Sequence, residues 1–166
     1  MSSSKKIAKS PRAVFLVVAT VLFIVGFVTF GNLSNLQEVT VASGNGFVNF
    51  NDGTSVEVEI ADSNAEKVKG LSGHVQLGPE EGMLFLYEKE TTPGFWMKDM
   101  GFVIDIIWIN DDLVISLNEY LPPEDPVKTL YYPEAPVDRV LEVPSGFIEE
   151  HGVMVGDRLD ITLPES

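Results

Sequence analysis

The chain has 166 residues, 25 acidic and 11 basic side chains, and a formal net charge of -14. Residues 1–30 carry four basic residues and no acid, so residues 31–166 carry -18. A body this acidic repels phosphate backbones, and we expect no nucleic acid partner. The chain has no cysteine and only two histidines, His74 and His151. Thiolate catalysis, disulfides, cysteine-ligated zinc and histidine-rich metal sites are thereby excluded, and we expect no metal and no cofactor.

Residues 13–30 contain no charged side chain and follow Lys5, Lys6, Lys9 and Arg12. As a helix they span about 27 Å at ~1.5 Å per residue, close to the ~30 Å hydrocarbon core of a bilayer. The positive-inside rule predicts a basic cytoplasmic stub (1–12), a transmembrane anchor (13–30), a polar linker (31–45) and an extracytoplasmic domain (46–166). We therefore expect a single-pass protein of the cell membrane.

Cleavage of the same segment as a signal peptide, followed by secretion, is the alternative. The apolar region of a signal peptide usually runs for about 7–15 residues and ends in small residues. Here the run is longer and ends in Val28-Thr29-Phe30-Gly31, which is a poor cleavage site. The pattern therefore favours an anchor that is retained.

The first predicted element of the domain is a β-hairpin over residues 47–60. Apolar Val56, Val58 and Ile60 alternate with glutamates, and Asp52-Gly53 supplies the turn. A short helix over 64–69 follows, because Asp62-Ser63 can cap its start and Gly70 can end it. Residues 83–87 are expected to form the next strand, and residues 88–93 a polar loop.

The central stretch, residues 94–110, is the most apolar part of the domain. Residues 102–109 are apolar at every position except Asp105, which predicts a strand covered on both faces. Residues 113–117 are expected to pair back on it across Asn110-Asp111-Asp112. Five prolines in 121–138 forbid regular pairing and predict a long extended loop.

The last elements are a strand over 139–143, a helical turn from Pro144 to His151 that ends at Gly152, and a turn and strand over 153–163. About seven short strands and two short helices predict a mainly β (α+β) domain. Because closure hides strand edges, we expect a small antiparallel, partly closed β-barrel after the N-terminal transmembrane helix.

Several short motifs in this order resemble the family known as the domain of unknown function 192, an uncharacterised group of bacterial and archaeal proteins. The resemblance implies a small β-rich domain, often secreted or membrane-anchored, and no established activity. It covers about residues 56–163. The matching pieces are Glu66 with Gly70-Leu71, Gly82-Met83-Leu84-Phe85, Phe95-Trp96-Met97-Lys98, Ile104-Asp105-Ile106-Ile107, Tyr132 with Pro136, Leu141-Glu142-Val143-Pro144-Ser145-Gly146, and Gly156-Asp157.

The chain departs from the family pattern at two places. The family usually shows Met and Arg where this chain has Ser72 and His74, and Asn-Thr where it has Asp99-Met100. A family site that used those positions would be altered here. Separately, residues 152–159 are similar to the Gly-Asp box of cradle-loop barrels. That similarity implies a turn in which Gly156 takes the turn conformation and Asp157 binds backbone amides.

Lys98, Asp105 and Glu142 are the candidate catalytic residues. An acid in an apolar strand can serve as a general acid or base, and Lys98 could then stabilise an anion. The structural alternatives are an ion pair between Lys98 and Asp105, or an Asp105 that accepts backbone N–H bonds. Glu142 lies between two apolar neighbours, so alternation predicts that it faces outward; pairing with Lys98 is the other interpretation.

Trp96, Tyr131 and Tyr132 are the candidate ligand-binding residues, because exposed rings can stack on a sugar or a peptide. They could equally serve as core and loop anchors. Acidic residues that could bind calcium lack the regular spacing of a calcium loop. These are Asp111, Asp112, Glu124 and Asp125.

No nucleotide-binding loop, nucleophile elbow or zinc-hydrolase motif occurs in the sequence. We therefore expect a non-catalytic module that binds an envelope protein or a small molecule. The alternative is an envelope-associated enzyme that uses Asp105 and Lys98.

Overall fold

A computed structural model describes residues 45–123 and 129–164 of the chain. These residues lie in a compact unit that spans Ala42–Ser166. They form the mainly β domain with two short helices that the sequence predicts. The elements are β1 (Gly46–Asn49), β2 (Ser55–Ala61), α2 (Asn64–Lys69), β3 (Glu81–Thr91), β4 (Ile104–Asn110), β5 (Leu113–Leu121), β6 (Val137–Pro144), α3 (Phe147–His151) and β7 (Asp160–Thr162).

None of the helices within these two ranges is long and apolar enough to cross a membrane. The predicted anchor over residues 13–30 lies outside the described residues. So do the stub and most of the linker.

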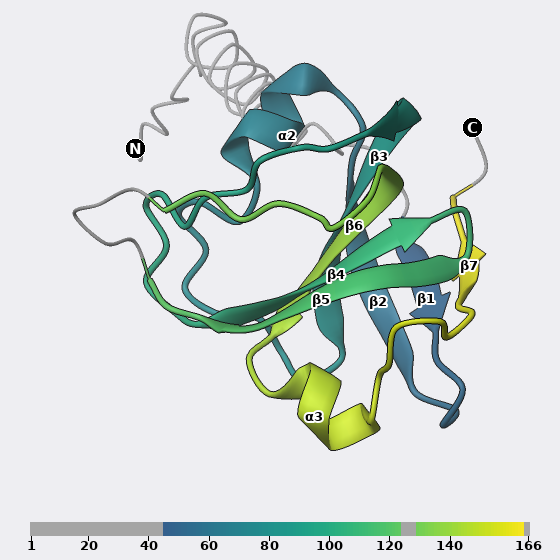
Figure 1. Ribbon diagram of the computed structural model, residues 1–166. Helices are drawn as coiled ribbons and strands as arrows, with labels where there is room; N and C mark the ends of the chain where they lie inside the picture. The colour runs from purple at the N-terminus through teal and green to yellow at the C-terminus, as the bar shows by residue number, and fades with distance from the viewer. Residues whose placement is uncertain (1–44, 124–128, 165–166) are drawn as a thin grey trace, which may run out of the picture. The chain divides into compact units, whose positions relative to one another are not determined.

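The seven strands form one curled sheet in the order β5-β4-β6-β3-β2-β1-β7 (Figure 1). An isolated bridge between Leu113 and Arg158 joins the start of β5 to the segment before β7, so the two ends of the sheet meet at one point. The sheet is thus a half-barrel. The expectation of a wholly antiparallel sheet is wrong, because β2 and β3 pair in parallel. The connection between them contains α2, as a parallel crossover requires.

The predicted helix over 64–69 is present with the predicted cap. Ser63 accepts a hydrogen bond from the backbone N–H of Glu66, and the Glu66 carboxylate accepts one from the backbone N–H of Ser63. This reciprocal arrangement satisfies two N–H groups that a helix start leaves without partners. It fixes the point at which the chain leaves β2.

Two hydrophobic cores lie on opposite faces of the sheet. The first is covered by α3 and the C-terminal turn, and the second by loops from residues 70–77, 93–103 and 129–136. The first core contains Val48, Phe50, Val56, Val58, Leu84, Ile107, Ile109, Val114, Leu141, Val143, Phe147, Ile148, Val153 and Leu159. The second contains Ala61, Leu71, Met83, Phe85, Phe95, Met97, Met100, Ile104, Ile106, Trp108, Leu121, Val137 and Val140.

Strand β4 supplies side chains to both cores, as its unbroken apolar run predicts. Strand β5 runs on to Leu121, beyond the predicted end at Leu117. Its second half contains Asn118-Glu119-Tyr120, and side chains on a sheet edge are partly exposed, so no apolar period marks them. Strand β3 likewise extends to Thr91 through polar residues that the sequence predicts to be a loop.

The Asp105 carboxylate connects three elements. It is fully buried on β4 and accepts hydrogen bonds from the backbone N–H groups of Tyr120 (2.8 Å), Gly146 (3.0 Å) and Ile148 (3.2 Å). Tyr120 lies near the end of β5 and has a φ of 55°, and Gly146 and Ile148 form the start of α3. Hydrogen bonds to a charged acceptor are stronger than neutral ones. The second structural alternative for Asp105, an acceptor of backbone bonds, is the arrangement observed.

Replacing Asp105 by Asn tests this arrangement. The amide would present an NH₂ group to backbone donors, so at least one buried N–H would lose its partner. We expect Asp105→Asn to lower the free energy of unfolding by about 3 kcal/mol, measured by urea denaturation at neutral pH. Asp160→Asn, on an exposed side chain of β7, is the matched control and should change it by less than about 0.5 kcal/mol. Equal midpoints for the two variants would contradict the assigned role.

Candidate functional site

Lys98 and Asp105 do not lie at one site. Lys98 is half exposed on the loop between β3 and β4, and its Nζ lies 2.6 Å from Oδ2 of Asp99. Among residues 45–123 and 129–164, no hydrogen bond or ion pair joins Lys98 to Asp105. The predicted ion pair between them is therefore not formed. Lys98 was expected in an apolar region because its neighbours are apolar, but the loop turns its side chain to solvent.

Asp105 and Glu142 lie on opposite faces of the sheet. Asp105 is paired in register with Val143, which belongs to the first core. Glu142 is paired with Ile106 on β4 and with Met83 on β3, both in the second core. Directly paired residues share a face, so Asp105 faces α3 and Glu142 faces the covering loops. The three candidate catalytic residues thus occupy three separate places.

The expectation that Glu142 faces outward is wrong. Its side chain alternates with Leu141 and Val143 as predicted, yet it is only 5% exposed, because loops cover this face too. Alternation gives the face of a strand but not what covers that face. The Glu142 carboxyl is therefore a buried polar group between apolar strands.

Burial raises the pKa of Glu142 from 4.5 to about 8, so the carboxyl is mainly protonated at neutral pH. Its Oε2 has no hydrogen-bond partner among the described residues. Burial also raises the pKa of Tyr87 to about 12, and the negative charge that Glu142 acquires at high pH adds to this effect. Buried polar atoms almost always have hydrogen-bond partners, so this carboxyl oxygen is an exception that requires an explanation.

A small cavity of about 20 Å³ lies beside Glu142. It sits between the turn after α2 and the loop before β4. Two hydrogen bonds hold these segments together, from Ser72 Oγ to the carbonyl of Lys98 (2.8 Å) and from the N–H of Gly73 to the carbonyl of Asp99 (3.3 Å). This Glu142 cavity is lined by Lys67, Val68, Lys69, Gly70, Leu71, Ser72, Phe85, Phe95, Trp96, Met100 and Glu142.

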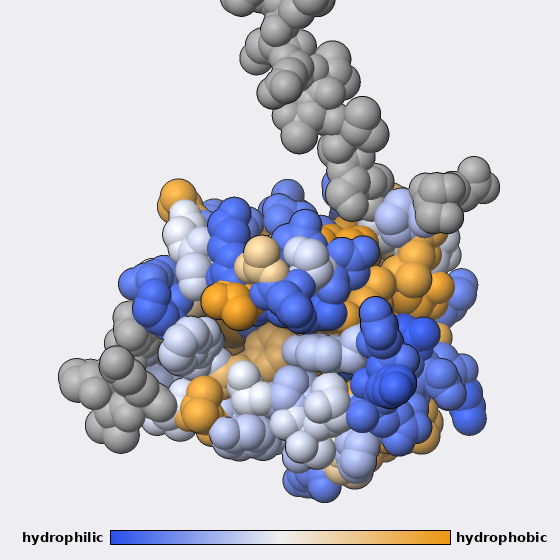
Figure 2. All heavy atoms as spheres, turned by 90° about the horizontal axis from the view of Figure 1, so that it is seen from above, coloured by the Kyte–Doolittle hydropathy of each residue, from blue (hydrophilic) through white to orange (hydrophobic). Residues whose placement is uncertain are grey.

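An aromatic surface adjoins this cavity and shares Trp96 with it. Phe95 and Tyr131 pair through two backbone hydrogen bonds of 2.9 and 2.8 Å, and both contact the second core. Their neighbours Trp96, Leu130 and Tyr132 therefore point away from the core, and they are 45%, 46% and 54% exposed. We call these three residues the aromatic surface. Seen from above, the domain carries apolar patches among hydrophilic groups (Figure 2).

The ring of Tyr132 lies directly over Gly94. A Cβ added at Gly94 would be 2.8 Å from the ring, closer than real contacts allow. Glycine at this position therefore lets the ring approach the backbone closely. Of the three ligand-binding candidates, Trp96 and Tyr132 lie on the aromatic surface, and Tyr131 anchors the loop beneath them.

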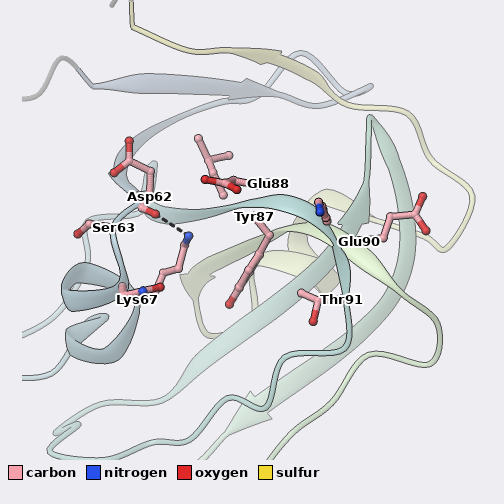
Figure 3. A pocket seen from close by; sticks show the side chains of 10 residues that line it. Asp62, Ser63, Lys67, Tyr87, Glu88, Glu90 and Thr91 are labelled. Carbon is pink, nitrogen blue, oxygen red and sulfur yellow. Dashed lines mark hydrogen bonds between the residues drawn. The ribbon is translucent and has the colours of Figure 1, made fainter.

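A wider groove of about 1060 Å³ runs between α2 and the second half of β3 (Figure 3). Lys67 reaches from α2 and donates to the backbone carbonyl of Asp62 (2.5 Å), and its ammonium lies 4.8 Å from the centre of the Tyr87 ring. The groove also presents Glu88 and Glu90 to solvent. Its acidic and basic groups are mixed, so no one ligand chemistry is indicated.

Gly156 and Asp157 form a turn at the end of the first core. Gly156 has a φ of 97°, and Asp157 Oδ2 accepts a hydrogen bond from the N–H of Met154 (2.8 Å). The backbone groups of Gly156 and Asp157 bond to Val114 on β5. The turn thus joins the C-terminal segment to the far edge of the sheet.

One polar cluster has no signal in the sequence. His151 Nδ1 lies 2.8 Å from Asp52 Oδ2 and 2.9 Å from Thr54 Oγ1, which connects the β1–β2 turn to the end of α3. The backbone N–H of Thr54 and the side chain of His151 together lower the pKa of Asp52 to about 2. These residues are 97 to 99 positions apart, so only the fold brings them together. Within residues 45–123 and 129–164, no three potential metal ligands gather at one place.

Comparison with known proteins identifies the domain. The sequence profile of DUF192, described as "Uncharacterized ACR", matches residues 47–161. The chain belongs to the DUF192 family. No curated protein matches it.

Two solved structures are similar to this DUF192 domain. A putative transcription regulator from Sinorhizobium meliloti 1021 is 27% identical, with a TM-score of 0.63, covering 70% of this chain and 92% of that one. A protein of unknown function from Novosphingobium aromaticivorans DSM 12444 is 30% identical, with a TM-score of 0.64, covering 70% of this chain and 83% of that one. Both support the fold, and neither has an established activity to carry over.

Of the four positions at which the sequence is expected to depart from the DUF192 pattern, two lie at the Glu142 cavity. Ser72 and Met100 both line it. Asp99 has a φ of 55°, a left-handed conformation that Asn and Asp tolerate better than other side chains, so Asp can stand where the family has Asn. His74 lies 3.5 Å from Glu59 and outside the cavity lining.

Glu142→Gln should remove a pH dependence of stability. The folded protein holds the Glu142 proton up to a pH of about 8, whereas the unfolded chain releases it near 4.5. Stability from this group is therefore complete below pH 4.5 and is lost as the pH rises towards 8. The free energy of unfolding of the wild type, relative to Glu142→Gln, should fall by about 1.4 kcal/mol per pH unit across that window.

Urea denaturation at pH 5, 6, 7 and 8 measures this slope. Glu150→Gln, on an exposed side chain of α3, is the matched control and should run parallel to the wild type. Parallel curves for Glu142→Gln and wild type would show that the Glu142 carboxyl is ionised in the folded domain.

Proposed function

We propose that this protein is a membrane-anchored, extracytoplasmic module that binds a ligand or partner without catalysing a reaction. The observation that carries the proposal is the position of Trp96. Trp96 lines the Glu142 cavity, and its side chain is also part of the exposed aromatic surface. A ligand could thus stack on exposed rings while one of its groups reaches a buried acid.

The geometry favours binding over the alternative, an envelope enzyme that uses Asp105 and Lys98. Asp105 is fully buried, and its two oxygens already accept three backbone hydrogen bonds. Lys98 lies on an exposed loop beside Asp99. General acid–base catalysis requires its groups within hydrogen-bond reach of one reacting centre, and these two do not meet that condition.

The membrane location rests on the sequence. Four basic residues precede an uncharged stretch over 13–30, and the remainder of the chain carries -18. Placement of the acidic domain outside agrees with the positive-inside rule. An extracytoplasmic domain could then present the aromatic surface to envelope components.

Protease added to intact cells tests the topology. We expect digestion of the domain that contains residues 46–166, while a cytoplasmic marker protein stays intact. The same treatment after permeabilisation should digest both. Full protection of the domain in intact cells would refute the proposed topology, and recovery of the domain in the medium would support the secreted alternative.

Trp96→Ala tests the binding site. In a ligand-observed NMR screen of small polar and aromatic compounds against the full chain, compounds that bind the wild type should lose at least about tenfold in affinity, because stacking area is removed. Since Trp96 is half exposed, the melting temperature should change little. Phe47→Ala, a similarly exposed aromatic on β1, is the matched control and should retain binding. Compounds that bind the wild type and Trp96→Ala with equal affinity would contradict the proposed site.

A further inference from the structure

The Glu142 carboxyl needs a donor that the described part of the chain does not supply. Its Oε2 is buried without a hydrogen bond, and none of the described ion pairs includes Glu142. Lys67 and Lys69 on α2 line the cavity, but the Lys67 ammonium is bound to the Asp62 carbonyl and Lys69 is exposed. Tyr87 on β3 also interacts electrostatically with Glu142, but its hydroxyl does not bond to Oε2. A buried carboxyl oxygen left in this state is costly, so a ligand that brings a donor gains a strong contact.

The size of the cavity restricts that donor. About 20 Å³ holds one group the size of a water molecule. The lining holds polar side chains (Lys67, Lys69, Ser72) as well as apolar ones, so a ligand with a polar head and an apolar stem matches it. An ammonium group, –NH₃⁺, has a similar size, carries its own apolar stem, and forms a charged contact with a carboxylate. A trimethylammonium or guanidinium head is too large for the space.

The walls also favour a cation on an apolar stem. The rings of Phe85 and Phe95 pack edge to face with their centroids 4.7 Å apart. Trp96 and Met100 are further large apolar residues of the lining. Aromatic rings attract cations within about 6 Å, with more effect when water is excluded. The charge of -18 on residues 31–166 further concentrates cations at the surface.

We propose that the Glu142 cavity binds the ammonium group of a primary alkylamine, with the methylene stem lying against Trp96. The inference rests on the proposed binding function and names its ligand class. Two sources share this chemistry: a lysine side chain of a protein or peptide, and a free diamine or polyamine.

Binding should release a proton. The empty site holds the carboxyl proton up to a pH of about 8, and the ammonium pairs with the carboxylate. Affinity should therefore rise about tenfold per pH unit from pH 6 to 8 and level off above 8, until the amine itself loses its proton near pH 10.

Isothermal titration of the full chain with n-butylamine at pH 6, 7, 8 and 9 tests the proposal. We expect binding at pH 8 and the pH profile just given. 1-Butanol has the same stem without the charge, and butyltrimethylammonium has the charge on a larger head. Both should bind at least tenfold more weakly. Nα-acetyl-lysine methylamide and cadaverine represent the two sources, and the tighter of them assigns the source.

Glu142→Gln should weaken butylamine binding at pH 8 at least tenfold, whereas Glu150→Gln, the same change on α3, should leave it unchanged. If Glu142→Gln does not fold, the pH profile and the two analogues still decide the matter in the wild type. Equal binding of butanol, or binding that strengthens as the pH falls, would overturn the proposal, because the protonated acid would then be donating to a neutral group.

Failure of this inference differs from failure of the proposed function. Compounds that bind in a manner sensitive to Trp96→Ala, with no binding of alkylamines, would refute the amine and retain the binding module. A screen in which no compound depends on Trp96 would refute both.

Discussion

Burial of β4 and β6 on both faces is the constraint on which the rest of this structure depends. A central strand of an antiparallel sheet usually has one wet face. Here α3 and the C-terminal turn cover one face, and three loops cover the other. Each covering segment needs specific contacts with the sheet, because loops and a five-residue helix have little stability of their own. The hydrogen bonds to Asp105 hold α3 on the sheet, and the backbone pairing of Phe95 with Tyr131 holds two of the loops together.

The two buried acids of these strands show opposite solutions to the same physical problem. Asp105 is surrounded by backbone N–H groups, which satisfy its charge and make it part of the framework. Glu142 Oε2 has no donor among the described residues, and burial raises the pKa of the carboxyl. Burying a carboxyl group without a hydrogen-bond partner costs stability. The presence of Glu142 at this cost favours a role in binding, since functional sites commonly lower stability.

Sequence patterns predicted much of the fold. Three elements were predicted from local patterns and are present. They are β2 from its period of two, α2 from its capping residues and β4 from its apolar run. The parallel pairing of β2 with β3 was not predicted, since nothing local in 62–80 distinguishes a crossover from a hairpin return. The extension of β5 beyond Leu117 was missed because polar edge residues carry no period.

The candidate site was predicted in its residues but not in its arrangement. Glu142, Trp96 and Tyr132 were all singled out by residue type, yet their relation depends on loops whose paths follow from tertiary contacts. Lys98 and Asp105 were grouped because both lie close in sequence to apolar residues, but the loop exposes Lys98. The alternation of side chains along paired strands places Asp105 on the opposite face of the sheet from Glu142. The cluster of Asp52, Thr54 and His151 shows the same limit, because its members approach only after the sheet curls.

The pairing of β1 with β7 has a consequence for how the protein is made. Asn49 is paired with Asp160, so the first and last strands of the domain are neighbours separated by 111 residues of chain. Contacts of such long range form slowly, because the entropy of closing the loop is lost before they can form. During synthesis β1 emerges first but has no neighbour on its outer edge until the C-terminal strand has left the ribosome. The sheet can therefore be completed only after the whole domain has been synthesised, because its first strand pairs with its last.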